Sequence, residues 1–174
     1  SLHDLDGGTR VTFTSSFSKT VAPGLRVGYF VVAAELVRAY DDRAVSTYIS
    51  PSLLPQAVVF ELIDSGGFEP NLERVRGLLR VRRDAMLGAL DAIAPTGVSW
   101  SRPEGGYFLW IDFGAGVDSA ALLSRATEAG VTFVKGSDFF LGGAAGSSAA
   151  RLAFSYETPE RIADGVAILA KLLI

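Results

Sequence analysis

Lys19 and Arg26 lie in one polar stretch, SSFSKTVAPGLR, between two apolar segments. The link of residues 15–24 is shorter than the dozen or more residues that a parallel crossover needs, so the two flanking strands should run antiparallel. The end of the first strand then lies beside the start of the second. We therefore expect Lys19, Arg26, Ser16 and Ser18 to converge at one edge of a sheet.

This set of side chains suits a phosphorylated aldehyde. Two cations held close together destabilise a site unless an anion lies beside them, and guanidinium and hydroxyl groups are good donors to phosphate oxygens. An amine kept beside another cation and away from water is also a nucleophile for carbonyl groups. The alternative is a polar loop with solvated surface charges, and the residue types alone do not separate the two interpretations.

Arg151 is a second residue suited to binding. It opens the segment RLAFSY (151–156), which we predict as a strand, and the alternation places it on one face with Ala153 and Ser155. An arginine among small neighbours leaves space for a carboxylate to bind through two hydrogen bonds. A salt bridge on an edge strand is the alternative interpretation.

The composition excludes other kinds of chemistry. The chain has no cysteine, so disulfides, thiolate metal sites and a cysteine nucleophile are ruled out. The single histidine, His3, cannot build a metal cluster or a Ser-His-Asp triad, and we expect it at the surface of a polar lead-in. The net charge of −3, without a basic stripe, argues against direct contact with nucleic acid. No signal peptide and no membrane span are visible, so we expect a cytoplasmic protein.

The elements that must position these residues follow from the hydrophobic pattern. The chain is 49% hydrophobic and 20% charged, which is typical of a folded protein. The pattern predicts strands over 10–14, 25–32, 97–100, 105–113, 131–135 and 151–156, the second apolar enough to be buried on both faces. It predicts helices over 33–45, 52–65, 69–93, 118–130 and 158–174. The glycine-rich segment 136–150 is expected to be a loop.

Two helix starts are marked by capping residues. Asp118 or Ser119 should cap the helix over 118–130, and Thr158 should cap the last helix with Pro159 in its first position. The order of elements predicts an α/β protein in three parts. These are a sheet remnant over 1–50, a linking helix over 51–67, and a compact α/β domain over 68–174.

The stretch SSFSKTVAPGLRVGYF (15–30) closely resembles the lysine-bearing motif of class I/II aminotransferases, the fold-type I enzymes that use pyridoxal 5′-phosphate. The similarity continues at Gln56 and in RPEGGYFLWIDF, GVTFVKGSDFF and RLAFSYETPERIADGVAIL, so it covers essentially the whole chain. It is strongest to the branch with 2-aminoadipate-type aminotransferases and the aminotransferase-like domain of MocR regulators. The resemblance implies the end of the large-domain sheet followed by the C-terminal small α/β domain.

The resemblance also implies roles for residues. Lys19 would carry the cofactor as a Schiff base and later shuttle a proton, while Ser16, Ser18 and Arg26 would hold the phosphate. The amino group would move from an amino acid to a 2-oxo acid in a ping-pong reaction, and the enzyme would be a homodimer.

Two positions nearer the C-terminus have roles implied in the same way. Arg151 would bind the α-carboxylate of the amino acid substrate. Tyr107 and Phe108 would line the substrate pocket, although packing against Trp110 accounts for both rings equally well.

Family enzymes are much longer than this chain. The resemblance places their glycine-rich phosphate turn, stacking aromatic ring and pyridine-binding aspartate ahead of the lysine motif, so we expect residues 1–174 alone to be a poor catalyst. The effector-binding domain of a MocR/GntR-type transcription regulator is the main alternative to an enzyme. A related fold-type I lyase and an α/β module without a ligand are the others.

Overall fold

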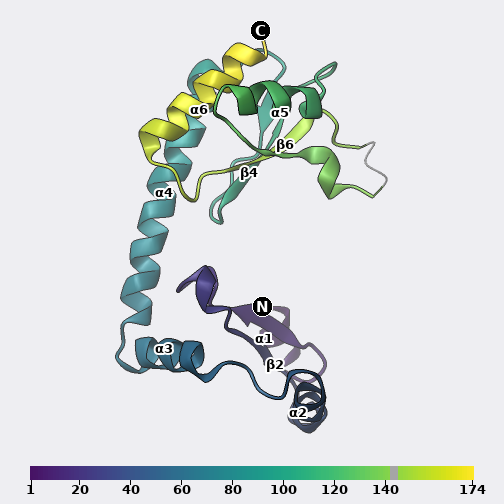
Figure 1. The fold of residues 1–174 in the computed structure, drawn as a ribbon, viewed down its shortest axis with the longest axis vertical. Helices are drawn as coiled ribbons and strands as arrows, with labels where there is room; N and C mark the ends of the chain where they lie inside the picture. Colours follow the sequence, from purple (N-terminus) through teal and green to yellow (C-terminus); the bar gives the residue numbers. More distant parts are fainter. Residues whose placement is uncertain (142–144) are drawn as a thin grey trace. The chain divides into compact units, whose positions relative to one another are not determined.

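The chain folds into two compact units, Ser1–Val75 and Arg76–Ile174, each of which mixes helices and strands. We describe them separately from a computed structural model that covers residues 1–141 and 145–174 (Figure 1). The long helix α4, Phe68–Ile93, contributes residues to both units. The predicted α/β class is confirmed.

The first unit contains the predicted pair of antiparallel strands. Strand β1, Phe13–Ser16, pairs with β2, Gly28–Val31, so that Ser16 lies opposite Gly28. A short 3₁₀ helix, η1, Pro23–Leu25, lies in the link between them. Helices α2, Ala34–Tyr48, and α3, Leu53–Asp64, follow the strands, and α3 begins after Ser52, where the sequence predicts it to begin.

The prediction that the second strand is buried on both faces is wrong. All four residues of β2 are exposed, and Phe30 keeps 62% of its surface accessible. The sheet of this unit has two strands, so no further strand covers β2 among the residues that the structure describes. The strand is also shorter than predicted, because η1 and the left-handed backbone of Arg26 occupy its expected start.

The predicted polar lead-in is partly helical. Helix α1, Leu2–Asp6, is capped by Ser1, whose side chain accepts a hydrogen bond from the Asp4 amide. His3 is half-buried and not simply a surface residue, because its Nδ1 lies 2.7 Å from the Val11 carbonyl oxygen.

The second unit contains a four-stranded antiparallel sheet in the order β3-β4-β6-β5. Its strands are β3, Ser99–Trp100; β4, Phe108–Asp112; β5, Val134–Lys135; and β6, Ala149–Ala153. Helices α5, Ser119–Glu128, and α6, Pro159–Leu172, pack with α4 on this sheet (Figure 1). Buried Leu109, Ile111 and Leu152 meet buried Leu122 and Leu169 of those helices in one core.

The predicted caps are present in this unit. Asp118 accepts a hydrogen bond from the Ala120 amide at 2.8 Å, and Thr158 accepts one from the Arg161 amide at 3.4 Å. Hydrogen bonds from its own amide and from the Thr158 hydroxyl hold the pKa of Glu160 below its usual value. The negative charge of Glu160 therefore persists in the first turn of α6, where the helix dipole favours it.

The prediction of an unstructured loop over 136–150 is wrong in part. Residues Gly136–Phe139 form the 3₁₀ helix η2, and Ala149 and Ala150 belong to β6, while residues 142–144 lie outside the described residues. The backbone approach is very close here, since a Cβ on Gly136 would lie 2.5 Å from the Gly146 carbonyl oxygen. The small residues permit that packing.

Candidate functional site

The end of the β1–β2 hairpin gathers the first set of predicted site residues. Ser16 ends β1, and Ser18 and Lys19 lie in the turn that follows it. The Val21 amide donates to the Phe17 carbonyl oxygen at 2.8 Å and closes this turn. Arg26 precedes β2 by two residues, so the link returns to the same hairpin end.

The structure brings Arg26 and Ser18 into contact. One Arg26 amino group, Nη1, lies 3.4 Å from Ser18 Oγ and 3.4 Å from the Pro23 carbonyl oxygen. Both distances are long for hydrogen bonds, and both acceptors are neutral. Arg26 forms no ion pair within the described part of the chain. Its charge is therefore available to an anion from outside.

Arg151 marks a second cluster, in the other unit. It lies in β6 between its register partners Trp110 of β4 and Val134 of β5. The guanidinium carbon is 4.0 Å from the centre of the Phe108 ring and 5.0 Å from that of Phe139. The expected alternative of an edge-strand salt bridge is wrong, because β6 is an inner strand and Arg151 has no ion pair among the described residues.

The guanidinium of Arg151 keeps an unused donor. Its Nε atom is buried and has no hydrogen-bond partner in the described part of the chain. A buried donor without a partner costs on the order of 1–3 kcal/mol, and a water, an ion or a ligand that accepts from it removes that cost. A carboxylate that accepts from Nε–H and a neighbouring amino group would satisfy it.

Tyr107 directly precedes β4, in the same unit as Arg151. Its ring lies 6.2 Å from the Phe108 ring, and its carbonyl oxygen accepts a hydrogen bond from the Phe154 amide at 3.0 Å. Phe139 is the neighbour of Arg151 that sequence reasoning missed. Its segment was expected to be a loop, and no periodic pattern connects η2 with β6.

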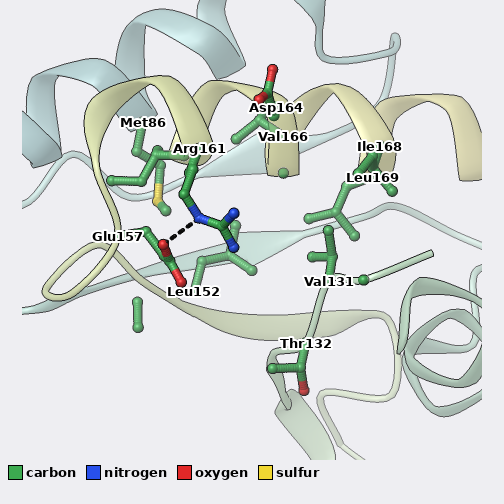
Figure 2. A pocket seen from close by; sticks show the side chains of 14 residues that line it. Met86, Val131, Thr132, Leu152, Glu157, Arg161, Asp164, Val166, Ile168 and Leu169 are labelled. Atoms are coloured by element: carbon green, nitrogen blue, oxygen red, sulfur yellow. Dashed lines mark hydrogen bonds and ion pairs between the residues drawn. The ribbon is translucent and has the colours of Figure 1, made fainter. Parts of the chain in front are cut away.

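A cavity of about 530 Å³ lies elsewhere in the second unit (Figure 2). Its walls include the apolar side chains of Met86, Val131 and Leu169, and Arg161 Nε pairs with Glu157 Oε2 beside them at 2.6 Å. None of the predicted site residues lines this cavity. Asp164 lines the cavity as well, and we assign the cavity no role in the proposed chemistry.

Other kinds of site find no support in the described residues. No group of three or more histidine, aspartate or glutamate side chains is arranged to hold a metal ion there. None of the helices in the ranges 1–141 and 145–174 is long and apolar enough to cross a membrane.

The α/β fold of both units is the fold of solved pyridoxal-phosphate-type aminotransferases. The alpha-aminoadipate aminotransferase of Thermus thermophilus, solved with N-(5′-phosphopyridoxyl)-L-leucine, superposes with a TM-score of 0.89 at 37% identity; the match covers 99% of this chain and 44% of that one. The family model described as Aminotransferase class I and II matches residues 1–169. The chain therefore belongs to the class I and II aminotransferase family.

Curated relatives include both enzymes and regulators. The 2-aminoadipate transaminase of Thermus thermophilus is 37% identical over 94% of this chain and 41% of its own length. The HTH-type transcriptional regulator YdfD of Bacillus subtilis is 30% identical over 93% of this chain and 33% of its own length. The chain thus spans about two fifths, or less, of the relatives that it matches.

Proposed function

We propose that this chain is the C-terminal part of a pyridoxal-phosphate-dependent aminotransferase that moves an amino group from an amino acid to a 2-oxo acid. The observation that carries the proposal is the hairpin end, where Lys19 shares a turn with Ser18 and Ser18 contacts an Arg26 that has no acidic partner in the described residues. Membership of the aminotransferase family over residues 1–169 supports it.

The residues at the hairpin end fit the phosphate of the cofactor. Arg26 supplies a charged fork of donors, and the hydroxyls of Ser16 and Ser18 supply neutral ones. Lys19 is then the residue to which the cofactor is attached. When bound, pyridoxal phosphate supplies an electron-withdrawing ring that stabilises negative charge at Cα of the amino acid. The Lys19 amine would take the proton from Cα of the amino donor, and in the second half of the reaction it would return a proton to Cα of the 2-oxo acid as that acid becomes an amino acid.

In this proposal Arg151 binds the α-carboxylate of the amino acid through Nε–H and an adjacent amino group. Tyr107 lines the same pocket. The chain would then divide into the end of the large domain over 1–50, a linking helix over 51–67 and the small domain over 68–174. We further propose a cytoplasmic homodimer for the full-length protein, and a chain of residues 1–174 that turns over little or no substrate by itself.

The test replaces Lys19 by alanine in the full-length protein. We expect Lys19→Ala to abolish the visible absorbance band of lysine-bound cofactor and to reduce transamination by several orders of magnitude. Lys171→Ala is the matched control, because Lys171 is an exposed lysine in α6. The proposal is wrong if Lys19→Ala keeps the absorbance band and the activity of the control.

The effector-binding domain of a transcription regulator is the second candidate. It is favoured by one observation, the match of a curated HTH-type regulator to 93% of this chain. In that case the full-length protein would bind DNA, and an amino acid or the cofactor would change its affinity for DNA. An electrophoretic mobility assay with and without pyridoxal phosphate, run beside the transamination assay, separates the two candidates.

A further inference from the structure

The aromatic surroundings of Arg151 go beyond what a carboxylate-binding arginine needs. Phe108 and Phe139 come from different elements, β4 and η2, and both place a ring within about 6 Å of the guanidinium carbon, the range of a cation–π contact. The ring of Phe139 is itself held by Trp110, since the two centres are 5.4 Å apart and the planes meet at 82°. Trp110 is also the register partner of Arg151. These contacts form one connected cluster.

The contacts leave the hydrogen-bonding edge of Arg151 unused. A cation–π contact places the guanidinium over the face of a ring and uses no hydrogen-bond acceptor, so the N–H donors can still bind a carboxylate. Arg151 has no hydrogen bond or ion pair to any described residue, and its Nε is buried. The aromatic contacts are thus the side-chain interactions by which the described residues hold this cation.

We propose that Phe139 and Phe108 are positioning residues, which hold the Arg151 guanidinium so that its Nε–H edge meets a substrate carboxylate. The assignment of that carboxylate to an amino acid rests on the proposed function. An arginine held in place before binding loses less conformational freedom when the ligand arrives, so affinity rises. The rings also exclude water from one side of the cation, which strengthens its attraction to an anion.

The position of Phe140 offers a matched control. Phe139 and Phe140 are neighbours with almost equal exposure, 46% and 45%. Both rings contact Trp110, with centres 5.4 Å and 6.3 Å away, but the contact with Arg151 is made by Phe139. Replacing either by leucine removes one aromatic ring and keeps an apolar side chain. Only the Phe139 change should disturb the arginine.

The first experiment measures binding without catalysis. The probe is 3-phenylpropanoate, a carboxylate without an amino group, titrated calorimetrically into the full-length protein. We expect Phe139→Leu and Phe108→Leu to raise its Kd about three- to thirtyfold, the range that corresponds to a lost cation–π contact. Phe140→Leu should leave Kd within about twofold of the wild-type value. Phe139→Tyr should retain wild-type affinity because it keeps a ring. Arg151→Gln should abolish binding of the probe.

The second experiment separates positioning from catalysis. In steady-state transamination, Phe139→Leu should raise KM for the amino donor by the same factor while kcat changes less than about twofold, because the ring does not touch the reacting atoms. A general loss of structure would instead lower kcat and the melting temperature, and tyrosine would not rescue it.

The outcomes distinguish this proposal from the proposed function. If the wild-type protein binds the probe through Arg151 and Phe139 but does not transaminate, the proposed function fails and the positioning role stands. If it transaminates while Phe139→Leu binds as tightly as Phe140→Leu, the positioning role alone is overturned. Absence of any Arg151-dependent binding of the probe also overturns it.

Discussion

Arg26 adopts a backbone conformation that is unfavourable for its type. Its φ is 55°, in the left-handed region that residues with a side chain rarely enter, and Gly24 nearby in the same link has an ordinary φ. Such a conformation costs about 1–2 kcal/mol and persists only where the surroundings hold it. In the proposed function, the guanidinium of this strained residue would bind the cofactor phosphate, and its strain would be a cost in stability.

This strain predicts opposite effects on stability and on cofactor binding. Without cofactor, we expect the free energy of unfolding of Arg26→Gly to exceed that of Arg26→Gln by about 0.5–1 kcal/mol, which a higher midpoint in urea would show. The reason is that relief of the left-handed strain exceeds the extra chain entropy of glycine in the unfolded state. Both variants should bind pyridoxal phosphate more weakly than the wild type, since both lack the guanidinium. Equal unfolding midpoints for the two variants would show that Arg26 is not strained.

At the level of single residues, the sequence predicts the groups that carry charge better than the groups around them. The short link between two strands was enough to place Arg26 beside Ser18, whereas the roles of Lys19, Arg26 and Arg151 stay predictions. Phe139 was not predictable as a partner of Arg151. Their contact depends on how η2 packs beside β6, and nothing in a local pattern specifies such tertiary packing.

Among the elements, the link between α1 and β1 depends on a single carboxylate. Asp6 Oδ2 accepts hydrogen bonds from the amides of Arg10 at 2.6 Å, Val11 at 3.0 Å and Thr9 at 3.0 Å. These bonds, the Arg10 amide first, hold the pKa of Asp6 below its usual value. A carboxylate that binds three amides orders the backbone of the whole link.

The lowered pKa of Asp6 predicts a link that loosens in acid. Because the folded-state pKa lies below the unfolded one, the stabilisation is complete above the unfolded value and is lost as the pH falls through the folded value. In hydrogen exchange, we expect protection of the Thr9, Arg10 and Val11 amides to fall in that range in the wild type. Asp6→Ala should lack this protection at neutral pH and show no further loss in acid.

A matched variant gives the control for this experiment. Asp42 is an exposed aspartate in α2 whose contact with Arg38 is 4.0 Å long, so Asp42→Ala should leave the three amides unchanged. Unchanged protection in Asp6→Ala would contradict the assigned role of the carboxylate.

Helices were easier to predict than strands in this chain. Helices α3, α4 and α6 each span several turns, so their apolar periodicity was visible in the sequence. Ser52 and Thr158 marked the starts of α3 and α6. The five-residue α1 is too short to show a period, although Ser1 and Asp4 do form a capping box. Burial of β2 was overestimated because an apolar run shows what a strand can bury, and not what covers it.

Across the whole molecule, burial is distributed unequally between the two units. Every member of the main hydrophobic core lies in Arg76–Ile174, where Leu122 and Ala126 are fully buried. In Ser1–Val75, all of which the structure describes, Val59 is the single hydrophobic residue in the buried class. Burial of apolar area is the dominant favourable term in folding, so the two units should differ in their ability to fold independently.

We therefore expect residues 68–174, which keep α4 whole, to unfold cooperatively in urea when produced alone. A core of this kind supports a free energy of unfolding on the order of 5–10 kcal/mol for a domain of this length. Residues 1–67 alone should give a broad, non-cooperative transition. Their β2 and α3 side chains are largely exposed already, so little buried apolar area becomes accessible to water on unfolding. Leu122→Ala in the larger fragment should cost about 2–5 kcal/mol, and Leu78→Ala, at an exposed position of α4, much less. Two results would contradict this: residues 68–174 that are unfolded alone, or a Leu122→Ala variant that loses no more free energy of unfolding than Leu78→Ala. Either would mean that the small domain depends on the rest of the protein for its core, and the proposed division of the chain at residue 68 would be wrong.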